Sequence, residues 1–237
     1  MPPSIHEMQY DLFIGDRTFS SWSLRGWLML HKFQIPHHLH MVGLYSGTLD
    51  RDLAPLAPAR LVPVLRTPQG DIIGESLAMA ETLAERHPKA GLWPADPALR
   101  ARARWLCSEM ATGFSALRSE CPMQLAHVVQ GVAPSPALMA DLARLDQIWS
   151  AARQLAAPVA VGPWLFGRYS LADVFFAPVA ARIIGYDLPI AAAHAGYVQA
   201  HITDPAFQTW RQAGLLRRYD PFPYYPTHAT SPWPGDS

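Results

Sequence analysis

The hydrophobic period of the sequence changes near residue 91, and this change limits the folds that the chain can adopt. Before it, short apolar runs alternate with amphipathic stretches, in the order strand, helix, strand, helix, strand, strand, helix. After it, apolar residues recur only at helical spacing. Residues 91–97, between the two regimes, contain prolines and a glycine and are typical of a linker. We therefore expect a small α/β domain followed by an all-helical domain.

The first part of the chain has the spacing of a βαβ unit followed by a hairpin. The first strand, helix and strand fit within about 35 residues, the length of a minimal βαβ unit, so the two strands should be parallel. Pro63 cannot donate to a ladder, which places it at a strand start or edge. We predict strands at residues 10–14, 37–44, 61–65 and 71–73, and helices at 21–33, 48–53 and 76–87.

The second part of the chain predicts helices alone. Ser170 and Asp173 form a capping-box pattern, which we interpret as structural. The predicted helical segments are residues 98–120, 135–156, 170–186, 190–202 and 205–216. We accordingly predict a first domain over 8–90, a linker over 91–97, a helical domain over 98–220 and a proline-rich tail over 221–237. Two interpretations of the tail stay open, a stiff extended lid and a disordered segment.

Composition excludes several classes of protein. Half of the residues are hydrophobic and 16% are charged, as in a well-buried globular protein. Lysine plus arginine number 19 and aspartate plus glutamate 19, so no cationic surplus is left for nucleic acid or an anionic membrane. The first ten residues lack the pattern of a signal peptide, and two cysteines are too few for a disulfide framework. We therefore expect a cytoplasmic protein with neither a nucleic-acid nor a membrane partner.

Four short motifs in this order resemble those of the cytosolic glutathione transferases. They are Ser20-Ser-Trp-Ser-Leu-Arg25, Leu61-Val-Pro-Val-Leu65, Glu75-Ser76 and Ser170-Leu-Ala-Asp173. The resemblance spans nearly the whole chain and implies a thioredoxin-like βαβαββα domain that binds glutathione. It also implies that the helical domain completes the pocket of a second substrate. A homodimer and a role in detoxification are further implications of the family.

The first motif is similar to the Ser-x-x-x-x-Arg motif of the zeta and tau classes, which implies that Ser20 is catalytic. Ser21 is then a helix cap or the alternative donor. Trp22 stands where the zeta pattern has cysteine, which argues against a maleylacetoacetate isomerase. No cysteine lies at this turn, which argues against the reductase activity of omega-like classes. The residues alone also allow both serines to be only helix caps.

The resemblance implies a set of glutathione-binding residues in the first domain. Val62 precedes a proline that is cis in the family, and its backbone would pair with the cysteinyl backbone of glutathione. Ser76 and the first N–H groups of its helix suit the γ-glutamyl carboxylate, with Glu75 accepting from the ammonium group. The glycyl carboxylate would meet Arg60 or one of His37 and His40. Without the family, these features indicate an edge-strand proline and an ordinary helix start.

Two further groups of residues carry side chains suited to binding. Strand alternation places His38 and His40 on one face and His37 on the other, so we expect no metal site there. The resemblance implies that Trp22, together with residues of the first helical segment of the second domain, faces the second substrate. These helical residues are Arg104, Trp105 and Ser108. For Trp105, a place in the core is the open alternative.

The leading hypothesis is thus a glutathione transferase in which a serine hydroxyl activates the thiol for attack on a small, apolar electrophile. Glutathione acts as a co-substrate in this reaction. One alternative is a glutathione-dependent isomerase or lyase. Another is a transferase-like module that binds ligands or proteins without catalysis.

Overall fold

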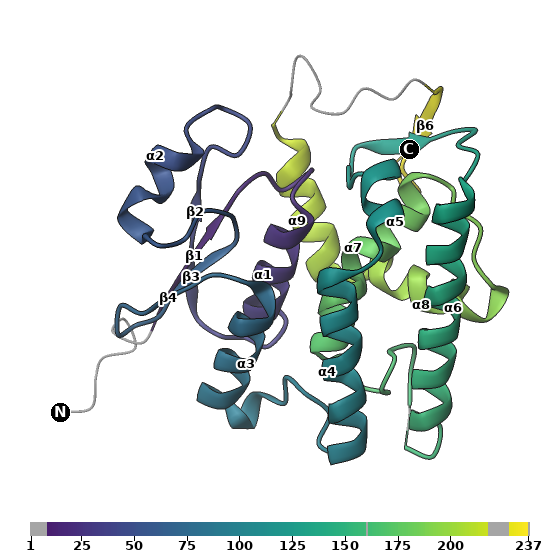
Figure 1. The fold of residues 1–237 in the computed structure, drawn as a ribbon, viewed down its shortest axis with the longest axis horizontal. Coiled ribbons are helices and arrows are strands. Elements are labelled where there is room, and N and C mark those ends of the chain that lie inside the picture. The colour runs from purple at the N-terminus through teal and green to yellow at the C-terminus, as the bar shows by residue number, and fades with distance from the viewer. Residues whose placement is uncertain (1–8, 160, 218–227, 237) are drawn as a thin grey trace. The chain divides into compact units, whose positions relative to one another are not determined.

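The computed structural model describes residues 9–159, 161–217 and 228–236 (Figure 1). The chain divides into two compact units, with the boundary between Leu92 and Trp93. This boundary falls within residues 91–97, and the finer domain limits stay predictions. Each unit is described by itself.

The first unit has a four-stranded mixed sheet in the order β2-β1-β3-β4. β1 and β2 are parallel, whereas β3 is antiparallel to both β1 and β4. This order of elements confirms the predicted thioredoxin-like fold. The strands are β1 (Tyr10–Ile14), β2 (His37–Met41), β3 (Val64–Arg66) and β4 (Ile72–Ile73), and the helices are α1 (Ser21–His31), α2 (Leu49–Leu53) and α3 (Ser76–Arg86). Short 3₁₀ turns follow α2 at Ala54–Leu56 and α3 at Pro88–Ala90.

Alternation along β1 separates the two faces of this sheet. Leu12 and Ile14 are fully buried, whereas Asp11 and Phe13 are half-buried on the opposite face. α1 and α3 pack against each other, and α2 lies on the other side of the sheet (Figure 1). The apolar strand predicted at 61–65 is displaced to β3, because Pro63 has no N–H for the ladder.

The second unit is mainly helical, as predicted. The helix predicted over 98–120 is split in two, because Phe114 has a φ of 58° in the left-handed region, which ends an α-helix. Both cysteines are buried, and burial raises the pKa of the Cys121 thiol to about 11, so this thiol is a poor nucleophile. The helices are α4 (Pro97–Thr112), α5 (Ser115–Glu120), α6 (Pro136–Ala156), α7 (Leu171–Gly185), α8 (Ala192–Thr203) and α9 (Pro205–Leu215).

The second unit also contains two short strands, so the expectation of helices alone after residue 98 was wrong in this detail. β5 (His127–Val129) pairs antiparallel with β6 (Thr230–Pro232). Each strand is short and its partner lies about a hundred residues away in the chain, so neither produces a local period. The fold class itself, a thioredoxin-like domain followed by a helical domain, is confirmed.

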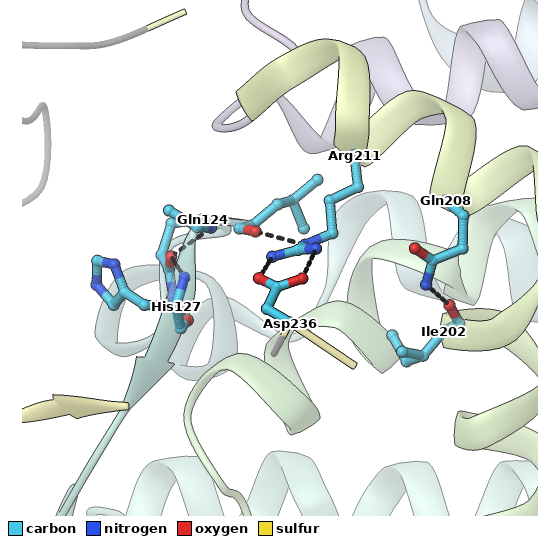
Figure 2. Close-up of polar contacts among 8 residues, drawn as sticks. Gln124, His127, Ile202, Gln208, Arg211 and Asp236 are labelled. Atoms are coloured by element: carbon cyan, nitrogen blue, oxygen red, sulfur yellow. Dashed lines mark hydrogen bonds and ion pairs between the residues drawn. The ribbon is translucent and has the colours of Figure 1, made fainter. Parts of the chain in front are cut away.

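The end of the proline-rich tail is packed against the second unit. Trp233 is 1% exposed, and the Arg211 guanidinium donates to both carboxylate oxygens of Asp236, at 2.8 and 2.5 Å (Figure 2). Arg211 also donates to the carbonyl of Leu125 at 2.8 Å. For residues 228–236, the expectation of a lid or a disordered segment is therefore replaced by a strand held to α9. Pro221, Pro223 and Pro226 lie outside the described residues.

Within the described ranges, no helix is both long and apolar enough to cross a membrane.

Candidate functional site

The turn that carries the expected catalytic serines follows β1 and adjoins the segment that leads into β3. Phe13 lies opposite Val64 in this antiparallel pair, so continuing the register by two residues sets Gly15 opposite Val62. The Val62 side chain packs against the backbone of Gly15, because a Cβ on Gly15 would lie 3.1 Å from Cγ2 of Val62. The first and second motifs are therefore neighbours in the fold.

The third motif reaches the same edge of the sheet. Leu65 lies opposite Ile73 in the antiparallel β3–β4 hairpin, so the end of β4, which leads to Glu75, lies at the same end of the sheet as the start of β3, which follows Pro63. The Glu75-Ser76 step then begins α3. The sheet topology thus brings together three predicted segments that are up to 60 residues apart in the chain.

Val62 and Pro63 lie between this hairpin and α1. Their peptide bond is cis, as the resemblance implied. α1 packs directly on the proline ring, since a Cβ on Gly26 would lie 2.9 Å from Cβ and Cγ of Pro63. Among the described residues, none hydrogen-bonds to the backbone N–H or C=O of Val62. The hydrogen-bonding groups of this backbone are therefore unused among the described residues, as a ligand that binds as an added strand requires.

Ser20 is the N-cap of α1, and its catalytic role stays a prediction. Its Oγ accepts from the backbone N–H of Ser23 at 3.2 Å and donates to the Ser23 Oγ at 2.8 Å. The Ser23 Oγ also accepts from the backbone N–H of Gly15 at 3.0 Å. Ser20 is 8% exposed and Ser23 fully buried. The cap is thus one part of a chain of hydrogen bonds that joins α1 to the end of β1.

A turn built by Asp16 places Ser20 at the start of the helix. The Oδ1 atom of Asp16 accepts from the backbone N–H groups of Thr18 and Phe19, at 2.7 and 2.8 Å. Its carbonyl accepts from the N–H of Ser20 at 3.1 Å. Asp16 is 4% exposed, so these bonds lie away from solvent, where lost hydrogen bonds are most costly.

The remaining residues of the first motif lie on the first turns of α1. Ser21 is buried and is the first residue of α1 rather than its N-cap, so the interpretation of Ser21 as a helix cap is wrong. The Arg25 guanidinium carbon lies 5.0 Å from the centroid of the Trp22 ring, and Arg25 is 1% exposed. A cation–aromatic contact therefore fixes the indole against the helix.

The N-terminus of α3 lacks a side-chain cap. Glu75 occupies the N-cap position with φ 45° and ψ 119°, an uncommon conformation for a residue with a side chain, and its carboxylate is exposed and makes no cap bond. Ser76 is 2% exposed. Within the described ranges, nothing accepts from the N–H groups of Ser76, Leu77 and Ala78 or bonds to the Ser76 hydroxyl. Open N–H groups at a helix N-terminus favour an anion.

Two of the residues expected at the glycyl carboxylate lie in different surroundings. His40 Nε2 lies 2.6 Å from Oδ1 of Asp11, and Arg66 donates to the other oxygen at 2.9 Å. Burial raises the pKa of Asp11, but the hydrogen bonds from His40 and Arg66 outweigh it, and the pKa lies below its usual range. Arg60 is exposed and makes no polar contact with a described residue. Their role toward glutathione stays a prediction.

The expected second-substrate residues of the second unit share one exposed side of α4. Trp105 is 51% exposed, so its core alternative is wrong; its Nε1 donates to Glu109 at 3.0 Å. The Arg104 guanidinium carbon lies 5.6 Å from the Trp93 ring centroid, and Ser108 is exposed. Trp22 belongs to the other unit. That these residues contact a substrate stays a prediction.

Sequence reasoning missed Ser23 and Gly15. Ser23 lies three residues after the cap, the position whose N–H a capping hydroxyl accepts, and this spacing was the available signal. A serine inside a helix is usually neutral or unfavourable, so it attracted no functional interpretation. The role of Gly15 depends on the approach of Val62, which the sequence does not reveal.

Comparison with known proteins shows which proteins this chain resembles. Residues 19–86 match the family model "Glutathione S-transferase, N-terminal domain", and this range spans α1, the cis-proline and α3. Residues 19–86 thus resemble the N-terminal domain of the glutathione S-transferases. The match covers the segments that assemble at the edge of the sheet, and the folds of solved family members extend over the helical unit as well.

Two solved structures illustrate the shared fold. A glutathione transferase homologue from Burkholderia, solved with bound glutathione, is 21% identical and covers 89% of this chain and 100% of its own, with a TM-score of 0.60. A glutathione transferase from Phanerochaete chrysosporium, solved with oxidized glutathione, is 16% identical and covers 91% and 100%, with a TM-score of 0.64. At these identities the likeness concerns the fold alone.

One curated relative is closer in sequence but matches over a shorter range. A probable maleylacetoacetate isomerase from Caenorhabditis elegans is 35% identical over 109 residues. The alignment covers 46% of this chain and 50% of the relative. The chain thus spans about half the length of this curated relative.

Proposed function

We propose that this protein is a glutathione transferase in which the Ser20 hydroxyl stabilises the glutathione thiolate. The observation that carries the proposal is the buried Ser20 hydroxyl at the N-terminus of α1, the helix that packs on Pro63 directly after Val62. The cysteinyl part of a peptide paired with Val62 would lie beside this helix N-terminus. Ser21 is the alternative donor, because it is the neighbouring hydroxyl at the same helix end.

The energy that this activation needs is within the range of one hydroxyl. Lowering a thiol pKa from about 8.5 by roughly 1.5 units takes about 2 kcal/mol of selective stabilisation. A hydrogen bond to a charged group contributes about 1.5–3 kcal/mol, and a helix N-terminus about 0.3–1 kcal/mol. The serine and the end of α1 together therefore supply enough.

The rest of the site supports a glutathione molecule held at its two ends. The uncapped N–H groups of α3 and the Ser76 hydroxyl would bind the γ-glutamyl carboxylate. The exposed Glu75 would accept from the γ-glutamyl ammonium group. Arg60 or His40 would meet the glycyl carboxylate. This arrangement leaves the sulfur at Ser20, where it attacks an electrophilic carbon; a sulfur–carbon bond forms and the leaving group departs with its electron pair.

The finer features of the function follow the same proposal. The second substrate would be small and apolar, with Trp22, Arg104, Trp105 and Ser108 completing its pocket. We further propose that the protein is a cytoplasmic homodimer acting in detoxification, with no metal, nucleic acid or membrane partner.

A glutathione-dependent isomerase is the second candidate, because the curated relative with 35% identity is a probable maleylacetoacetate isomerase. Trp22, in place of the zeta-pattern cysteine, argued against this activity at the level of the motif. In an isomerase the same serine would activate the thiol, and glutathione would leave unchanged after the double bond has rotated. Both candidates therefore require a lowered thiol pKa.

The test is the thiolate absorbance of bound glutathione as a function of pH, for wild type, Ser20→Ala and Ser21→Ala. We expect Ser20→Ala to raise the bound-thiol pKa by about one to two units. An unchanged value in Ser20→Ala would contradict the assignment, and a rise in Ser21→Ala alone would transfer the role to Ser21. Two assays then separate the candidates. A transferase should conjugate glutathione to a chloronitrobenzene, whereas an isomerase should convert a cis-dienoate into its trans isomer.

A further inference from the structure

We propose that Ser23 is a positioning residue that reverses its hydrogen bond with Ser20 when the thiolate binds. This inference rests on the proposed role of Ser20 and adds a second hydroxyl that acts only through the first. Ser23 does not touch the sulfur in this proposal. It takes over as donor to the Ser20 oxygen and so allows the Ser20 proton to point at the thiolate.

The starting arrangement uses the Ser20 proton inside the protein. The Ser20 hydroxyl donates to the Ser23 Oγ at 2.8 Å, and that oxygen also accepts from the Gly15 N–H at 3.0 Å. The Ser20 Oγ in turn accepts from the Ser23 N–H at 3.2 Å. A hydroxyl has a single proton, so in this state Ser20 has none to offer a thiolate.

The structure gives this bond with Ser20 as the donor, but a hydroxyl rotates about its C–O bond, so the same separation of the two oxygens also admits Ser23 as the donor. When both hydroxyls rotate about their C–O bonds, Ser23 donates to Ser20 across the same 2.8 Å, and the Ser20 proton is released toward the sulfur. The Ser23 Oγ still accepts from Gly15, and the Ser20 Oγ still accepts from the Ser23 N–H. No proton passes between oxygens and every N–H keeps its partner. The reversal therefore costs no buried hydrogen bond.

The burial of Ser23 makes this reversal specific. Ser23 is 0% exposed, and among the described residues the Ser20 oxygen is the sole partner placed to accept its hydroxyl proton. In the reversed state the Ser20 oxygen accepts from two donors while it donates to the thiolate. Chained hydrogen bonds polarise one another, so Ser20 becomes a stronger donor than an isolated serine.

The experiment is a double-mutant cycle on the bound-thiol pKa, with wild type, Ser20→Ala, Ser23→Ala and Ser20→Ala/Ser23→Ala. We expect Ser23→Ala to raise this pKa by about half to one unit, less than Ser20→Ala. In the double variant we expect the value of Ser20→Ala, because Ser23 acts only through Ser20. Glutathione affinity and melting temperature of each variant show that the protein is folded. Ser135→Ala, which removes the N-cap hydroxyl of α6, is the matched control and should leave the bound-thiol pKa unchanged.

Two results would overturn the inference while the proposed function stands. One is a wild-type pKa in Ser23→Ala together with a raised pKa in Ser20→Ala. The other is an additional rise when Ser23→Ala is added to Ser20→Ala. An unchanged pKa in Ser20→Ala itself would instead overturn the proposed function, and the inference with it.

Substitutions that keep a donor at this position guard against a folding defect in Ser23→Ala. Ser23→Thr retains the hydroxyl and should restore the wild-type bound-thiol pKa, whereas Ser23→Cys offers only a weak donor and should behave like Ser23→Ala. A raised pKa in a folded Ser23→Thr, or a wild-type pKa in a folded Ser23→Cys, would overturn the inference.

Discussion

The N-termini of α3 and α7 each contain one serine and one acidic residue, but only the N-terminus of α7 is capped by these side chains. α7 starts with Ser170 as the N-cap and Asp173 in its first turn, and α3 with Glu75 as the N-cap and Ser76 as its first residue. In α7 the side chains fold back onto the backbone, whereas in α3 they make no such bond. In these two helices, the start is closed where the serine precedes the carboxylate and is left open where the serine follows it.

The start of α7 is closed by one buried carboxylate. Asp173 accepts from the backbone N–H groups of Leu165 and Ser170, at 3.1 and 2.8 Å, and from the Ser170 hydroxyl at 3.1 Å. The predicted capping box is thereby confirmed. Burial raises the pKa of Asp173 to about 6, although these hydrogen bonds work against the rise. The Asp173 carboxylate thus bonds within the protein, and it occupies the N–H group at this helix start that a ligand would otherwise bind.

The largest effect we expect is on stability, from Asp173→Ala. It leaves the buried N–H groups of Leu165 and Ser170 without partners, so the free energy of unfolding should fall by about 3 kcal/mol or more. Urea unfolding followed by tryptophan fluorescence measures this loss. The control is Asp96→Ala, which removes the N-cap of α4 and should cost about 1 kcal/mol. An equal loss in the two variants would show that the buried box is no more than an ordinary cap.

The second effect is a pH dependence of stability that Asp173 introduces. Its folded pKa, about 6, lies above the unfolded value of about 3.9, so the folded state holds a proton that the unfolded state releases. This contribution is present below pH 4 and is lost as the pH rises through 6, by about 2 to 3 kcal/mol. Asp173→Asn should remove it. The measurement is the difference between wild-type and variant unfolding free energies from pH 4 to 7, and a constant difference would contradict the prediction.

The third effect belongs to the open helix start. Ser76→Ala should weaken glutathione binding about five- to tenfold, since it removes one hydrogen bond to a charged carboxylate. Stability should change by less than about 0.5 kcal/mol, because no described residue bonds to this hydroxyl. Calorimetric titration and urea unfolding measure the two quantities. A destabilised variant with unchanged affinity would mean that α3 is closed in the way that α7 is.

The smallest effect provides the reference for an ordinary cap. Ser135 accepts from the Leu138 N–H at 3.1 Å and donates to Glu120 at 2.7 Å. Ser135→Ala should lower the free energy of unfolding by about 1 kcal/mol and leave glutathione affinity as it is. The same two measurements apply. If affinity fell as far as in Ser76→Ala, the effect of Ser76 would be a general consequence of losing a helix-start serine.

Much of the first unit was predictable because its signals are local. The apolar run at β1, the cap at Ser20 and the stop before Pro36 each concern residues a few positions apart. The pairing of β5 with β6 was not predictable, since Trp233 and Arg211 become relevant there only once the tail has returned to the helical unit. The break after Gly113 was missed for a related reason, because the left-handed Phe114 continues an apolar helical pattern.

The sequence by itself determined the order of elements, the change from an α/β to a helical unit, and the motifs that indicate the glutathione transferase family. These depend on period, capping and turn chemistry within short windows. Tertiary structure alone decided that Gly15, Val62 and Glu75 meet at one edge of the sheet, and that Ser23 shares a hydrogen bond with Ser20. Strand register and burial set these relations, and both arise from contacts between segments far apart in the chain.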